Sequence, residues 1–160
     1  INLMRAHLTA KYGHSAFRVG QEEILSSLIE RKNVIAVLPT GAGKSLLYQF
    51  CATYTKTVSV VVSPLISLMN DQRLNLQSLG IKSVCLNSET TQSDLLALPN
   101  AEIVFVTPEN LTSECCRLWH AGLNIGLLAI DEAHCISQWS HDFRPAYRAL
   151  GSVRDRHPDL

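Results

Sequence analysis

The sequence predicts one α/β domain built on a doubly wound, mostly parallel sheet. Short β-branched runs alternate with segments of helical spacing along the 160 residues, as in repeated βαβ units. The runs are apolar almost without alternation, as expected for strands covered on both faces. Several runs end in residues suited to phosphate or metal chemistry, and ligands of open α/β sheets bind outside the carboxyl ends of the strands. We therefore expect these segments to meet at one edge.

Five strands are predicted, over residues 33–38, 58–63, 83–86, 102–107 and 127–131. The first predicted helix covers residues 21–31, and another follows the second strand and ends before Gly80, a typical residue at a helix C-terminus. Tyr12 and Trp119 are expected only to pack in the core.

The composition indicates an ordinary globular protein, with 46% hydrophobic and 18% charged residues. Fourteen basic and fourteen acidic residues cancel, which argues against a polycation or a polybasic membrane binder, although a local basic stripe remains open. The longest apolar runs are too short to cross a bilayer, so no membrane partner is expected. The sequence has five cysteines, an odd number, and no C-x-x-C motif. This favours reduced thiols in an intracellular protein over a disulfide framework or a zinc site.

A glycine-rich turn, P-T-G-A-G-K-S over residues 39–45, follows the first predicted strand. Such a turn lets backbone N–H groups and a helix N-terminus surround phosphate oxygens. Lys44 would place a positive charge beside the β- and γ-phosphates, and the Ser45 hydroxyl would hold Mg²⁺. The strict pattern G-x-x-x-x-G-K-[ST] is not met, because Leu38 stands at its first glycine. A Gly-rich turn need bind nothing, but the lysine, serine and helix favour a nucleotide. The residues expected to hold it are Thr40, Gly41, Ala42, Gly43, Lys44 and Ser45.

Asp131 and Glu132 follow the last predicted strand. Asp131 can hold Mg²⁺, because hard cations prefer carboxylate oxygens, and Glu132 can orient and deprotonate an attacking water. Two acids there could instead be ordinary residues of a helix N-terminus. Together with the glycine-rich turn, they favour hydrolysis of a bound nucleotide.

Phe17, Arg18 and Gln21 precede the first strand. A glutamine amide can face N6 and N7 of adenine, and an arginine can stack on the ring. The spacing alone favours a simpler interpretation, in which Phe17 anchors the core and Gln21 caps or decorates a helix.

Residues 135–147 concentrate aromatic side chains in a chain that has only 6% of them. Trp139, Phe143 and Tyr147 are interleaved with His141 and Arg144. Aromatic faces and cations suit stacking on unpaired bases and contact with phosphates. The alternative is a small satellite core under a loop.

These segments together resemble the first RecA-like lobe of RecQ-family DNA helicases, in the family's order, from residue 17 to about residue 147. The matching motifs are F-R-x-x-Q at 17–21, L-P-T-G-A-G-K-S at 38–45 followed by L-L-Y-Q at 46–49, V-V-S-P-L-I-S-L-M-N-D-Q at 61–72, V-T-P-E at 106–109, and D-E-A-H-C-I-S-Q-W at 131–139 continuing through F-R-P at 143–145. The fusion of a DEAH box to the aromatic-rich segment is the most specific of them.

The resemblance implies ATP- and Mg²⁺-dependent 3′-to-5′ unwinding of DNA in repair and recombination, with single-stranded and duplex DNA as partners. It implies a location in the nucleus of a eukaryote or the cytoplasm of a bacterium. The implied roles are adenine contact for Arg18 and Gln21, phosphate contact for Lys44, magnesium binding for Ser45 and Asp131, general base for Glu132, and coupling of hydrolysis to DNA for His134. The implied DNA contacts are Pro64, Ser67, Thr107, Trp139, His141, Phe143 and Arg144.

Residues 1–160 are thus expected to form the first RecA-like lobe, cut from a longer chain, since the sequence opens at Ile1 rather than Met. Asn110 stands where the family has arginine, and residues 88–101 look shorter than usual. Family members continue with a strand that lies between the strands of the glycine-rich turn and of the acid pair, and with a second lobe that carries an arginine finger. Without that finger, which is worth about a thousandfold or more in turnover, the chain is not expected to unwind DNA alone.

Two other functions fit parts of the sequence. The chain could belong to a DEAD/DEAH-type RNA helicase or another translocating ATPase, against which residues 139–144 argue. It could also be a nucleotide-responsive binding module without turnover, against which the intact Lys44, Asp131 and Glu132 argue.

Overall fold

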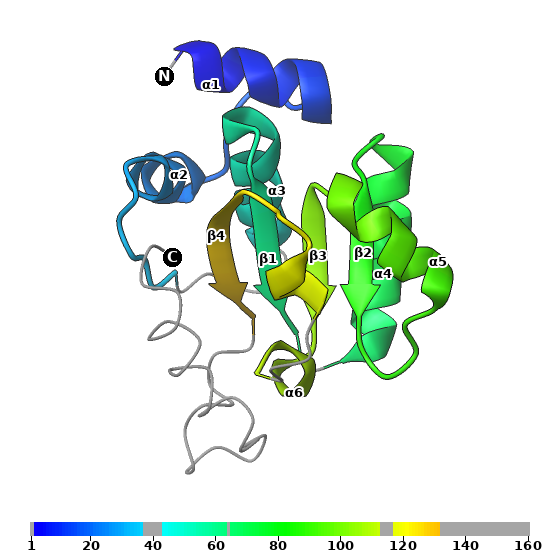
Figure 1. The fold of residues 1–160 in the computed structure, drawn as a ribbon. Helices are drawn as coiled ribbons and strands as arrows, with labels where there is room; N and C mark the ends of the chain where they lie inside the picture. The colour runs from blue at the N-terminus through cyan, green and yellow to red at the C-terminus, as the bar shows by residue number, and fades with distance from the viewer. Residues whose placement is uncertain (1, 37–42, 64, 113–116, 132–160) are drawn as a thin grey trace.

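The sheet of this domain has four parallel strands in the order β2-β3-β1-β4 (Figure 1). The computed structural model describes residues 2–36, 43–63, 65–112 and 117–131. The strands are β1 (Val58–Val62), β2 (Ser83–Leu86), β3 (Ile103–Val106) and β4 (Ile125–Ile130). Their parallel pairing and the helices between them confirm the predicted doubly wound α/β class.

Helices cover both faces of the sheet. The helical elements are α1 (Asn2–His7), the π-helix η1 (Leu8–Tyr12), α2 (Gln21–Ile29), α3 (Lys44–Thr55), α4 (Ile66–Ser78), α5 (Gln92–Ala97), η2 (Leu98–Asn100), α6 (Pro108–Leu111) and η3 (Arg117–His120). Residues of α3 and α4 pack with one set of strand side chains, and residues of η2, α6 and η3 pack with the other. Within the described ranges, no helix is long and apolar enough to span a membrane.

The central strands are buried on both sides, which explains why their sequences do not alternate. Every residue of β1 and β3 is buried. Val60 packs with the η2, α6 and η3 side of the core, and its neighbour Val61 packs with α3 and α4. Successive side chains point to opposite faces of a strand, so apolar residues are favoured on both faces. The exception in β1 is Ser59, whose buried hydroxyl donates a hydrogen bond to the Tyr48 carbonyl.

The strand predicted over residues 33–38 is not formed in the part that the structure describes. Residues 32–36 lie outside the sheet, and the Ile35 side chain is 94% exposed. A β-branched run becomes a strand only where a neighbouring strand pairs with it, and this run is not among the strands of the described sheet. Residues 37 and 38 lie outside the described ranges.

The N-terminal helices are held against α3 by a cluster of rings. His7 lies edge-on to Phe50 and Tyr54, with ring centroids 5.1 and 5.4 Å apart. The Oγ1 atom of Thr53, on α3, is 2.9 Å from Nε2 of His7 and 2.9 Å from the hydroxyl of Tyr12. The segment before residue 13 is therefore attached to the same helix that begins at the glycine-rich turn.

This attachment is expected to weaken in acid. Burial, and then the nearby charge of Lys11, lower the pKa of His7 below its usual 6.5, so below that pH the unfolded chain binds more protons than the folded one. His7 also faces the rings of Tyr12 and Tyr54. The contribution of neutral His7 to the free energy of unfolding is complete above about pH 6.5, and it falls as the pH drops toward the lowered pKa of His7.

Urea unfolding at pH 7.5 and 5.5 measures this effect. The wild-type chain should lose more free energy of unfolding between the two pH values than the His7→Gln variant does. An equal loss in both proteins would mean that protonation of His7 does not matter for stability.

Two of the five cysteines, Cys51 and Cys85, lie in the described part of the chain, and both are buried and free. Burial raises the pKa of each thiol to about 11. They are therefore protonated near neutral pH and pack as small apolar side chains.

Candidate functional site

The helix α3 begins directly at the predicted phosphate-binding residues. Gly43 is its N-cap, with φ of +81°, and Lys44 and Ser45 are its first two residues. No side chain among the described residues caps this end of the helix. The first N–H groups of an α-helix have no partner within the helix, and they favour an anion. The start of α3 is thus suited to a phosphate group.

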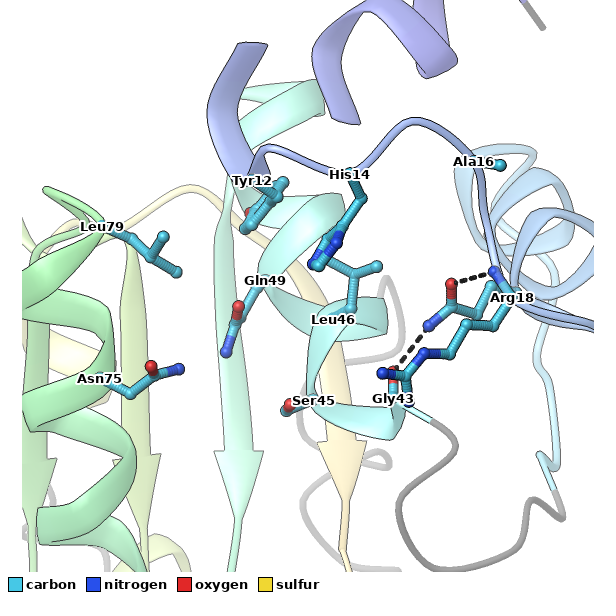
Figure 2. A pocket seen from close by; sticks show the side chains of 11 residues that line it. Tyr12, His14, Ala16, Arg18, Gly43, Ser45, Leu46, Gln49, Asn75 and Leu79 are labelled. Atoms are coloured by element: carbon cyan, nitrogen blue, oxygen red, sulfur yellow. Dashed lines mark hydrogen bonds between the residues drawn. The ribbon is translucent and has the colours of Figure 1, made fainter. Parts of the chain in front are cut away.

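Gln21 ties the start of α3 to the segment before α2 (Figure 2). Its Oε1 accepts a hydrogen bond from the backbone N–H of Arg18 at 2.8 Å, and its Nε2 donates to the carbonyl oxygen of Gly43 at 3.1 Å. The side chain is only 2% exposed. In this geometry the Gln21 amide positions Arg18 and the N-cap of α3 relative to each other. A contact between Gln21 and adenine stays a prediction.

Replacing Gly43 with alanine is expected to cost more stability than the same change at Gly13. Both glycines have φ above +70°, so each variant carries the left-handed backbone cost of about 1 kcal/mol. A Cβ at Gly43 would collide with Nε2 of Gln21, whereas a Cβ at Gly13 would meet nothing within 4 Å. Displacing the Gln21 amide should add about 1–3 kcal/mol. Equal free energies of unfolding in the two variants, measured in urea, would contradict this account of Gln21.

The residues that follow three strands line up along one edge of the sheet. The ladder hydrogen bonds continue past the strand ends, from Asp131 N–H to the Val62 carbonyl at 2.9 Å and from Ser63 N–H to the Val106 carbonyl at 3.0 Å. Thr107 N–H donates to the Leu86 carbonyl at 3.2 Å in the same way. The predicted meeting of these segments at the carboxyl edge is therefore confirmed for β1, β3 and β4.

Tyr48 connects α3 with the central strands β1 and β3. It lies one turn after Lys44, its carbonyl oxygen accepts a hydrogen bond from the Ser59 hydroxyl at 2.8 Å, and its ring lies edge-on to Phe105 at 6.0 Å. Burial, and then the negative charge of Asp131, raise the pKa of Tyr48 well above its usual value. The Asp131 carboxylate thus acts on the side of α3 that follows Lys44.

Ser45 and Asp131 offer one hydroxyl and one carboxylate. No group of three or more histidine, cysteine, aspartate or glutamate residues that could hold a metal occurs in the described part of the chain. Mg²⁺ suits such a sparse set, because it keeps several waters and takes its other ligands from one or two carboxylates and from substrate phosphates. The residues present fit Mg²⁺ bound together with a phosphate chain.

Ser67 and Thr107 lie in the segments that follow β1 and β3. Ser67 is exposed in the first turn of α4. Thr107 is the N-cap of α6, where its hydroxyl oxygen accepts a hydrogen bond from the N–H of Asn110 at 3.4 Å. A capping role for Thr107 is therefore visible, and DNA contact by either residue stays a prediction. The predicted site residues outside the described ranges are Thr40, Gly41, Ala42, Pro64, Glu132, His134, Trp139, His141, Phe143 and Arg144.

A pocket of about 320 Å³ opens beside the start of α3 (Figure 2). Its lining comes from the N-terminal segment, α2, α3 and α4, and includes Tyr12, His14, Arg18, Gln21, Gly43, Ser45, Leu46, Gln49, Asn75 and Leu79. No site role was predicted from the sequence for His14, Gln49 and Asn75, and Tyr12 was expected only to pack in the core. Gln49 could have been found from its spacing, because it follows Ser45 by four residues and so shares its face of the helix.

Comparison with known proteins agrees with this arrangement. The model of the DEAD/DEAH box helicase family matches residues 18–159. The chain is 43% identical over 147 residues to the ATP-dependent DNA helicase RecQ of Bacillus subtilis, covering 87% of this chain and 25% of that protein. It is 39% identical over 158 residues to the RecQ helicase of Haemophilus influenzae, covering 95% of this chain and 26% of that protein. The chain thus spans about a quarter of the length of these curated relatives.

The fold also matches a solved helicase structure. A hypothetical ATP-dependent RNA helicase from Sulfolobus tokodaii aligns with 99% of this chain and 46% of its own, with a TM-score of 0.63 and 20% identity. That likeness supports the fold alone, a RecA-like lobe. The family model and the identity to RecQ proteins confirm the resemblance that the motifs predicted, and the chain belongs to the DEAD/DEAH box helicase family.

Proposed function

We propose that this chain is the ATP-binding motor lobe of an ATP-dependent DNA helicase. Within the parent protein, it would bind Mg-ATP and couple its hydrolysis to 3′-to-5′ unwinding of DNA in repair and recombination. The observation that carries the proposal is the uncapped start of α3, at Lys44 and Ser45, together with the position of Asp131 directly after β4 at the carboxyl edge of the sheet. The names of the relatives, which are ATP-dependent DNA helicases, support the reaction and the substrate.

The residues of the lobe divide the work of holding a nucleotide. The backbone N–H groups at the start of α3 and the Lys44 ammonium would bind the β- and γ-phosphates. Ser45 and Asp131 would hold Mg²⁺, which neutralises charge on the phosphate oxygens when it is bound. Glu132 would accept the proton of the attacking water.

DNA contact is proposed for the segments at the same edge. Ser67 and Thr107 follow neighbouring strands there, and Pro64 belongs to the same segment as Ser67. The segment after Asp131 carries His134, Trp139, His141, Phe143 and Arg144, whose rings and cations suit stacking on unpaired bases and contact with phosphates. Since this segment follows the acid pair directly, a change at the γ-phosphate could be passed to a bound strand.

The second RecA-like lobe of the parent chain is a further proposed partner. The relatives are about four times as long as this chain, and an arginine finger supplied from elsewhere is worth about a thousandfold or more in turnover. The isolated chain is therefore expected not to unwind DNA.

The choice between DNA and RNA is tested with the full-length parent protein. Its ATP hydrolysis is measured with poly(dT) and with poly(U), matched in length and concentration. Stronger stimulation by the DNA strand is expected, because residues 131–145 match the RecQ pattern. Stronger stimulation by the RNA strand would overturn the assignment in favour of an RNA helicase.

A further inference from the structure

Gln49 carries a buried amide whose nitrogen donates no hydrogen bond to the rest of the described chain. The side chain is only 3% exposed, and its Nε2 has no hydrogen-bond partner among the described residues. A buried N–H without an acceptor costs about 1–3 kcal/mol, so such a group calls for an explanation.

The unpartnered amide lines the pocket beside the start of α3. Gln49 lies one helical turn, about 6 Å along the axis, from Ser45, and both residues line the pocket. Figure 2 shows the Gln49 side chain projecting from α3 toward Asn75 on α4. The last side-chain torsion of glutamine is soft, so a small rotation can turn the N–H toward an occupant.

The surroundings of Gln49 suit an uncharged, partly apolar group. Leu46, Leu79 and the ring of Tyr12 line the pocket around it, and Asn75 adds a second amide. The amide oxygen of Gln21 already accepts from the Arg18 N–H, and its amide nitrogen already donates to the Gly43 carbonyl. Gln49 therefore differs from Gln21, and from the exposed Asn75, in lining the pocket with a buried N–H that has no partner among the described residues.

We infer that Gln49 is a further nucleotide-binding residue, and that its amide N–H donates to a neutral acceptor on the nucleoside half of the bound nucleotide. The phosphates would lie at the start of α3 and the base and ribose would extend along α3 toward Gln49. This inference rests on the proposed binding of ATP, and it assigns to Gln49 the discrimination between a nucleotide and a bare phosphate chain.

The test compares ATP with inorganic tripolyphosphate, which lacks the nucleoside. Binding of each to the full 160-residue chain is measured by calorimetry for the wild type and for Gln49→Met, Gln77→Met and Lys44→Ala. Methionine keeps the length of the side chain and removes the amide. Gln77 is an exposed glutamine on α4 outside the pocket lining, so its variant is the matched control.

Gln49→Met should bind ATP about two- to tenfold more weakly, the range expected for one lost hydrogen bond to an uncharged group. Its binding of tripolyphosphate should be unchanged, and so should both affinities in Gln77→Met. Without ligand, Gln49→Met should be at least as stable in urea as the wild type, because it removes an unpartnered polar group. A variant that simply misfolds would fail this last measurement.

Other results would overturn the inference in distinguishable ways. If Gln49→Met binds ATP as the wild type does, while Lys44→Ala binds neither ligand well, the role of Gln49 is wrong and the proposed function stands. If Gln49→Met weakens both ligands equally, its effect is structural and the inference is wrong. If the wild type binds neither ligand, the proposed nucleotide site fails and the inference fails with it.

Discussion

Lys44→Ala is expected to abolish ATP hydrolysis by the full-length parent protein and to weaken ATP binding by about 10- to 100-fold. The estimate follows from the loss of a hydrogen bond between charged groups, worth about 1.5–3 kcal/mol. Lys44 is the first residue of α3, exposed beside N–H groups that no described side chain caps. In the variant, the phosphates would keep their contacts with the backbone N–H groups. They would lose the positively charged Lys44 ammonium beside the transferred phosphate.

The measurement pairs steady-state ATPase rates with calorimetric titration of ATP. Lys82→Ala serves as the control, because Lys82 is an exposed lysine just before β2, at the amino end of the strand. The control should keep both activities. If Lys44→Ala hydrolyses ATP at the wild-type rate, Lys44 does not hold the transferred phosphate and the glycine-rich turn has another purpose.

Glu132→Gln is expected to reduce ATP hydrolysis by the parent protein by about 10²- to 10⁴-fold while ATP still binds. This is the range for removing a general base, and the amide keeps the size of the carboxylate but cannot take the proton of water. The expectation builds on the position of Asp131, whose N–H extends the ladder between β1 and β4 at the carboxyl edge.

Glu89→Gln is the matched control, because Glu89 is an exposed acid in the segment after β2. Single-turnover hydrolysis and titration of ATP should separate the two variants, with binding kept in both and hydrolysis lost only in Glu132→Gln. Normal hydrolysis by Glu132→Gln would remove the base assignment but leave the binding site untouched.

The sequence predicted the sheet well where burial decides the structure. The runs that became β1 to β4 are mostly apolar, and the observed strands differ from the predicted ranges by at most two residues at either end. The run at 33–38 has the same apolar and β-branched character, yet its described residues stay outside the sheet. Whether such a run forms a strand depends on a neighbouring strand that pairs with it, and the local sequence preference does not reveal that neighbour.

The sequence predicted which residue types belong to the candidate site better than it predicted the contacts that those residues make. The amide of Gln21 suggested an adenine contact, and its spacing suggested a residue that caps or decorates a helix. Neither interpretation foresaw that the amide would bond to Arg18 and to Gly43, which is 22 residues away. The unpartnered N–H of Gln49 was equally invisible, because an unmet hydrogen bond becomes apparent only when every neighbouring group has been placed. Conversely, the alignment of Asp131 with Ser63 and Thr107 followed from parallel strands alone.

Metal binding in the presence of ATP tests the central claim most directly. Mn²⁺ replaces Mg²⁺ as a visible probe, and the free ion is measured by electron paramagnetic resonance as the chain is added with and without ATP. ATP-dependent uptake of Mn²⁺ is expected for the wild type and should be much weaker in Asp131→Asn and in Lys44→Ala, because both residues would hold one metal–triphosphate unit. Equal uptake by all three proteins would show that the start of α3 and the acid after β4 do not share a ligand.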